Sequence, residues 1–308
     1  MKSILASALA ALAQGNGRFR GVFARWALLL PVLLAAAGCS TINVAYTGGP
    51  TVLGFVADSY LDLDSDQSAA LKTRILAVRE WNRSTHLVEY ARFFAEVRAR
   101  AAGPVSPDDV AWAVAEARKR WAVMAERVAA EIADLAPQLN AENFAALRKK
   151  LDKNTADFIK DVIKQDPERQ RKRRFERVRG EAERWYGDFD DDQLERIRAW
   201  TDALPVNYAL MLENRRRRQA DFLAALTEAA AKGADRAAVR QRLFRLLTDW
   251  EAGRSPAYQA VASQYQAASY RLAADIANLA TPAQRATAQR RTQRWIDDIA
   301  ALGARPGP

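Results

Sequence analysis

The chain has 308 residues, of which 49% are hydrophobic and 27% charged, a balance that allows a sizeable core and argues against wholesale disorder. It contains one cysteine and one histidine, which excludes an intrachain disulfide and a Cys/His zinc cluster. The formal charge is +10, and four of the basic residues precede Cys39. Without that leader the charge falls to about +6, so the remainder is mildly basic.

The N-terminal segment is typical of a bacterial export signal. Basic residues precede an uncharged apolar run over 26–37, which is shorter than the roughly 20 residues that a membrane-spanning helix needs. Small residues then lead into Cys39, and this arrangement resembles the lipobox of bacterial lipoproteins, although Ala36 stands where leucine is most frequent. The resemblance implies cleavage before Cys39 and acylation of its thiol, with palmitate among the acyl chains. By resemblance to sorted lipoproteins, Ser40 implies transfer to the outer membrane.

Other interpretations of this segment are an ordinary secretory signal with a chance cysteine and a short membrane anchor. The basic leader is long, which is explained if translation begins near Val22. We predict a signal peptide over 1–38, a lipidated tether over 39–62 and a helical periplasmic domain over 63–304.

The part after the tether has a helical pattern almost throughout. Gly48-Gly49-Pro50 predicts a turn inside the tether. From residue 63 apolar residues recur every three or four positions, and no alternating strand pattern occurs. Helices are predicted over 71–97, 107–136, 144–162, 167–185, 194–204, 208–226, 239–250 and 256–279, with a last one from 282. Short connections favour an all-α fold, either an antiparallel multi-helix bundle of about eight helices or stacked helical hairpins.

Four of the expected helix starts share one local motif. A capping residue is followed three positions later by an amide side chain, which is the spacing of a capping box. The motif occurs at Asp64 and Gln67, Asn140 and Asn143, Asp190 and Gln193, and Thr281 and Gln284. It resembles the Leu-Thr-x-x-Gln motif of small periplasmic chaperones of the Spy and CpxP type, which implies a chaperone-like relationship. Capping alone is the simpler interpretation.

A longer pattern lies between Cys39 and Tyr90. It comprises Tyr46, Pro50, Tyr60-Leu61-Asp62, Gln67, Trp81-Asn82-Arg83 and Leu87-Val88-Glu89-Tyr90. This pattern resembles a family of Gram-negative lipoproteins that is described only as a domain of unknown function, in which histidine occupies the place of Asn82 and proline the place of Val88. The resemblance implies an envelope location and a helical fold, but no activity.

Few residues suggest a binding or catalytic site. His86 has no second imidazole or thiol to act with, and we expect it to be half-buried or on the surface. The acidic residues Asp188, Asp190, Asp191 and Asp192 lack calcium-loop spacing and suit a helix N-terminus. We therefore predict no metal site and no cofactor. Two basic runs are the best candidates for anion binding: Arg171, Lys172, Arg173, Arg174 and Arg215, Arg216, Arg217, Arg218.

Four consecutive helical residues fan over about 300° of arc, so neither run can form one flat patch. Salt bridges to neighbouring helices are the plainer interpretation of both runs. Our leading hypothesis is a non-enzymatic, membrane-anchored lipoprotein that binds a periplasmic protein or an anionic envelope component, with no nucleic-acid partner. A chaperone-like holdase and an enzyme acting on envelope polymers are the alternatives.

Overall fold

The computed structural model describes residues 41–249 and 254–304, and in this part of the chain every regular element is helical. The predicted all-α class is confirmed, although the described residues form eleven α-helices where about eight were expected. None of these helices has the length and apolar character needed to cross a membrane. The helices are α4 (Thr41–Leu61), α5 (Ser65–Thr85), α6 (Leu87–Arg100), α7 (Pro107–Leu135), α8 (Ala141–Phe158), α9 (Pro167–Tyr186), α10 (Asp191–Asp202), α11 (Tyr208–Ala230), α12 (Arg236–Thr248), α13 (Pro256–Leu279) and α14 (Pro282–Ala304). A 3₁₀ turn, η1 (Ala136–Gln138), follows α7, and a π-helical turn, η2 (Ile159–Ile163), follows α8.

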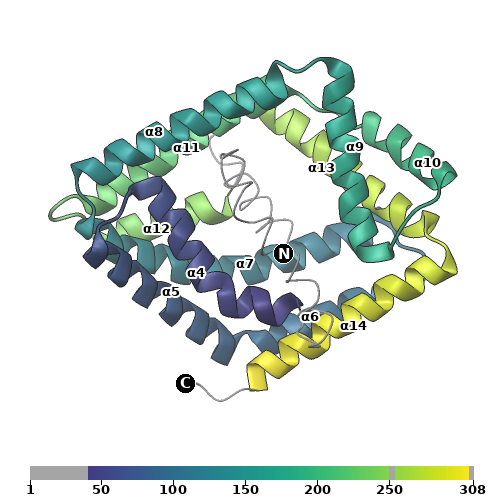
Figure 1. Cartoon of the computed structure of the whole chain (residues 1–308), viewed down its shortest axis with the longest axis horizontal. Helices are drawn as coiled ribbons and strands as arrows, with labels where there is room; N and C mark the ends of the chain where they lie inside the picture. The colour runs from purple at the N-terminus through teal and green to yellow at the C-terminus, as the bar shows by residue number, and fades with distance from the viewer. Residues whose placement is uncertain (1–40, 250–253, 305–308) are drawn as a thin grey trace, which may run out of the picture.

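The helices follow a four-sided outline. In Figure 1, α8 and α11 lie along one edge, α6 and α14 lie along the opposite edge, and α4 lies inside the outline. The closest-packed neighbours are α14 with α6 and α12 with α7. Pairs of packed helices therefore form the edges, and no single bundle axis organises the chain.

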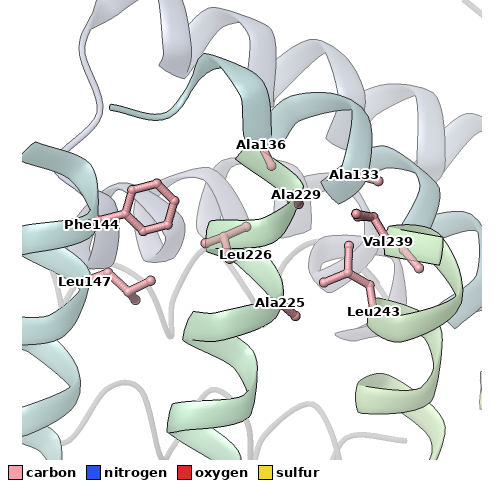
Figure 2. Packing of buried hydrophobic residues seen from close by; sticks show 10 residues of the cluster. Ala133, Ala136, Phe144, Leu147, Ala225, Leu226, Ala229, Val239 and Leu243 are labelled. Atoms are coloured by element: carbon pink, nitrogen blue, oxygen red, sulfur yellow. The ribbon is translucent and has the colours of Figure 1, made fainter. Parts of the chain in front are cut away.

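The apolar core is divided into three clusters of buried residues. The first joins α7, η1, α8, α11 and α12, and Figure 2 shows Phe144 and Leu147 of α8 facing Leu226 of α11, with Val239 and Leu243 of α12 beyond it. The second joins α9, α10 and α13 around residues such as Phe175 and Ile197, and the third lies between α6 and α14. The packed helices thus share three apolar clusters.

The predicted interruption at Gly48-Gly49-Pro50 is wrong, because α4 continues through all three residues. Proline removes one backbone hydrogen bond, but packing at both ends of the helix outweighs that loss. Ile42 and Tyr46 pack against the third cluster, and Tyr60 and Leu61 pack against the first. Helical structure therefore begins well before residue 63, and α4 belongs to the folded domain.

Tyr46 fixes the N-terminal half of α4 against α5. Its single hydroxyl hydrogen is directed to the Arg79 carbonyl, 2.8 Å from the oxygen, and is shared with Asn82 Oδ1 at 3.4 Å. Burial raises the pKa of this phenol from 10.0 to about 12, more than the nearby positive charges of Arg79 and Arg83 lower it. The neutral phenol is thus the form that the fold favours.

This pKa shift predicts a loss of stability at alkaline pH. The contribution of Tyr46 is complete below pH 10, where the phenol is protonated in both states, and it declines as the pH rises from 10 to about 12. In urea unfolding at several pH values, Tyr46→Phe should be less stable at neutral pH and should show a smaller decline across that window. The exposed Tyr265→Phe change is the matched control. An unchanged decline in Tyr46→Phe would contradict the shift.

Candidate functional site

Two of the four residues in the first basic run, Arg173 and Arg174, make contacts within the fold. Arg173 donates a hydrogen bond to the carbonyl of Asp161 in η2. Arg174 donates to the hydroxyl of Tyr208 at 2.9 Å and lies 3.8 Å from the carboxylate of Asp202. Two residues of the run are exposed and make no hydrogen bond or ion pair with the described part of the chain: Arg171 and Lys172.

The second basic run divides around α11. Arg216 and Arg217 are exposed, and Arg217 lies 4.0 Å from Asp221 one turn later. Arg215 contacts α8, and Arg218 lies close enough to Arg254, just before α13, to be affected by its charge. The structure therefore leaves Arg216, Arg217 and Arg218 exposed and places Arg215 against α8.

Arg215 lies between α8 and α11. Its guanidinium donates to the Asn154 carbonyl at 3.3 Å and lies 5.2 Å from the ring centroid of Phe158. Burial lowers the pKa of Arg215, and the neighbouring Tyr60 only partly offsets this effect. The guanidinium has thus lost part of its hydration without gaining a carboxylate partner among the described residues.

Tyr60 extends this site to the end of α4. Its hydroxyl accepts a hydrogen bond from Asn154 Nδ2 at 2.6 Å, and Lys150 Nζ lies 5.3 Å from the centroid of its ring. Burial raises the pKa of Tyr60, while the bond from Asn154 and the charge of Arg215 lower it. Two cations thus flank one neutral phenol.

The other side of the site is formed by α11 and the start of α13. Asn214 Nδ2 donates to the Tyr258 hydroxyl at 3.2 Å, and the Arg254 guanidinium lies 4.7 Å from the Tyr258 ring centroid. Desolvation of its guanidinium lowers the pKa of Arg218, although the residue as a whole is exposed, and the charge of Arg254 lowers this pKa further. We call this set the Arg215 cluster, and it comprises Tyr60, Lys150, Asn214, Arg215, Arg218, Arg254 and Tyr258.

Arg215 differs from the other arginines that have a buried, unsatisfied nitrogen, because it has no carboxylate partner among the described residues. Among the described residues, five have a buried side-chain nitrogen or oxygen without a hydrogen-bond partner: Arg120, Arg127, Arg174, Asn214 and Arg215. Three of the four arginines in this set have a carboxylate within ion-pair distance, namely Glu116, Glu131 and Asp202. Arg215 has none in the part of the chain that the structure describes. An unsatisfied donor and an uncompensated charge therefore coincide at this residue.

The structure gives the remaining described candidates packing or helix-capping positions. His86 is half-buried at the junction of α5 and α6, with its ring 4.5 Å from that of Trp81. Asp190 caps α10, and Asp191 and Asp192 lie in its first turn. Within the described residues, no group of three His, Cys, Asp or Glu side chains could hold a metal ion. Cys39 and Ser40 lie outside the described residues.

The four motif helix starts meet in two pairs. In the first pair, Gln67 Nε2 donates to Asn143 Oδ1 at 2.9 Å, and Asn143 Nδ2 donates to Gln67 Oε1 at 3.2 Å. Each amide oxygen also accepts a hydrogen bond from the backbone N–H of its own capping residue. Gln67 Nε2 donates in addition to the Gln138 carbonyl, and Asn143 Nδ2 lies within hydrogen-bond distance of the Leu61 and Asp62 carbonyls. The starts of α5 and α8 are therefore joined reciprocally.

The second pair repeats this geometry at α10 and α14. Gln193 and Gln284 donate to each other at 3.0 Å in both directions. Gln193 also donates to the Leu279 carbonyl at 3.1 Å, and Gln284 donates to that of Asp188 at 2.7 Å. Three of the four amide side chains are buried, so the motif joins helix starts and presents little surface to a client protein.

Residues of the longer family pattern also meet in space. Asn82 is buried, donates to the Tyr90 hydroxyl at 2.9 Å and accepts from Tyr46. Val88, by contrast, is 57% exposed. Tyr46, Asn82 and Tyr90 thus join α4, α5 and α6, which indicates an architectural role for this part of the pattern.

Removing one amide of a pair should cost more than removing an exposed amide. Asn143→Ala and Gln67→Ala should each lower the free energy of unfolding by about 1–3 kcal/mol, because each leaves buried polar groups without partners. The double variant should lose less than the sum of the single losses. Gln241→Ala, at an exposed amide on α12, is the control for urea unfolding. Additive losses would show that the two amides do not act together.

Comparison with known proteins identifies a family. A search of curated proteins and a search of solved structures each found no match. A family model described as a family of unknown function, DUF6279, matches residues 59–259. This range begins at the end of α4 and includes Gln67, Asn143 and Gln193 as well as the whole Arg215 cluster. The chain belongs to the DUF6279 family.

Proposed function

We propose that this chain is an exported lipoprotein, acylated at Cys39 and held at the outer membrane with its helical domain in the periplasm. The apolar run over 26–37, the small residues before Cys39 and the absence of any second cysteine support this proposal. Several acyl chains are needed for stable anchoring, since a single chain holds a protein only marginally.

The anchoring proposal is tested by replacing the cysteine. Cys39→Ala should abolish incorporation of labelled palmitate and move the protein from the outer-membrane fraction to a soluble or inner-membrane fraction. Ser40→Asp, which keeps the cysteine, should retain the label and change only the sorting. Label retained in Cys39→Ala would contradict acylation at this residue.

We infer that the domain binds an anionic envelope component at the Arg215 cluster rather than catalysing a reaction. One observation carries this inference: the Arg215 guanidinium is partly desolvated, with an unsatisfied Nε donor and no carboxylate partner in the described chain. A phosphate or carboxylate can accept bidentate hydrogen bonds from this group and neutralise its charge. Lipopolysaccharide, phospholipid headgroups and peptidoglycan carry suitable groups.

The neighbouring arginine on α11 provides a matched test. Arg215→Gln and Arg216→Gln remove the same charge, but only Arg215 belongs to the cluster. For the purified full-length protein in detergent, Arg215→Gln should weaken binding of lipopolysaccharide or soluble muropeptides about tenfold or more, as expected for a charge-assisted hydrogen bond.

Arg216→Gln should change the affinity little in the same titration. Lipopolysaccharide and muropeptides distinguish a phosphate ligand from a carboxylate ligand. Equal losses in the two variants would indicate attraction to net charge alone and would contradict a site at Arg215. Thermal unfolding of both variants shows whether the fold is retained.

A further inference from the structure

The outward face of α4 is uncharged along most of its length. From Cys39 to Ala57 the sequence contains no Asp, Glu, Lys, Arg or His, and the first charged residue is Asp58. A helix exposed to water normally carries charged or polar residues on the face away from the core. On α4 that face instead contains glycine, threonine and apolar residues.

Exposed apolar side chains are concentrated on this helix. Eight large hydrophobic residues are exposed in the described part of the chain, and four of them lie on α4: Val44, Val52, Leu53 and Phe55. At 100° per residue, Val44, Val52 and Phe55 fall within about 80° of arc. Phe55 is 73% exposed, the largest fraction among the eight. These three residues form one stripe, which we call the α4 face.

The opposite side of α4 is held against the domain, so the helix cannot turn this face inward. Tyr46 is hydrogen-bonded to α5, and Tyr60 is hydrogen-bonded to α8. Both ends of the helix also contact apolar clusters. The orientation of the α4 face is therefore set by the fold.

The position of the acylated cysteine determines what this face meets. Only Ser40 separates Cys39 from the start of α4, so the helix begins no more than about 7 Å from the Cys39 backbone. The acyl chains hold that backbone at the headgroup level, and the headgroup region is itself about 5–8 Å deep. The N-terminus of α4 must therefore lie in or beside the headgroups.

We propose that the α4 face lies on the membrane leaflet in which the acyl chains of Cys39 are inserted. Val44, Val52 and Phe55 contact the boundary between headgroups and acyl chains, as the apolar face of an interfacial helix does. The domain then has one fixed orientation on the membrane. This inference rests on the proposed acylation of Cys39.

The lone cysteine makes a selective probe possible. Because the native thiol is acylated in the mature protein, a cysteine introduced in Phe55→Cys is the only free thiol and can carry an environment-sensitive fluorophore. The full-length lipidated protein is placed in phosphatidylethanolamine–phosphatidylglycerol vesicles whose acyl chains are brominated to quench the probe. Tyr265→Cys, at an exposed apolar position on α13, is the control.

The proposal predicts that the fluorescence emission of the probe at position 55 shifts to the blue. Brominated lipid should also quench this probe several-fold more strongly than the probe at position 265. Vesicle-bound protein with both probes unquenched would overturn the proposal while leaving the lipid anchor intact. A blue shift without quenching would also overturn it, because a protein surface would then cover the face. Protein that neither incorporates palmitate nor floats with the vesicles would remove the proposed acylation and this inference together.

Discussion

The two reciprocal amide pairs are the interactions on which the rest of the structure depends. A helix start leaves backbone N–H groups without partners, and here each start is satisfied by its own capping box and tied to a second start by the same amide. One pair joins α5 to α8 and the other joins α10 to α14, across 76 and 91 residues of chain. These contacts set how the helix pairs meet in an outline with three separate cores, where no common core could position them.

The proposed lipid anchor and the candidate binding cluster lie at opposite ends of one helix. Thr41 follows Cys39 closely, while Tyr60 contributes to the Arg215 cluster, so about 28 Å of α4 separates them. With α4 along the leaflet, both ends of the helix lie near the headgroups, and the cluster lies on the domain side of the helix, about one helix diameter from them. With α4 upright, the cluster would face the periplasm instead. The orientation of this one helix therefore selects which anions the cluster can meet.

Local chemistry made most helices predictable, because caps, prolines and apolar spacing act within a few residues. The motif predicted helix starts at Asp64, Asn140 and Asp190, and helices begin there. It could not show which starts pair, since that depends on contacts distant in sequence. The break at His86 was missed because Ser84 and Thr85 bond back to the α5 backbone, a competition that apolar spacing does not reveal.

The α4 helix was missed because local propensity at Gly48-Gly49-Pro50 opposes the packing that decides its structure. The candidate site was predictable only in part, for a similar reason. Arg215 and Arg218 belong to a visible basic run, but Tyr60, Lys150 and Arg254 come from other segments and have no shared spacing. What distinguishes Arg215 from Arg216 is burial, which neither charge nor position in the run reveals.

The separation of the core into three clusters affects how the domain unfolds locally. Each cluster buries its own apolar side chains, so one can exchange its amide hydrogens with solvent while the other two remain protected. Two helices, α4 and α7, each reach both the first and the third cluster, and Trp185 of α9 packs against Trp295 of α14, so these shared elements set how far unfolding of one cluster spreads. The least stable cluster can therefore exchange first, and its loss reaches the other clusters through the helices that they have in common.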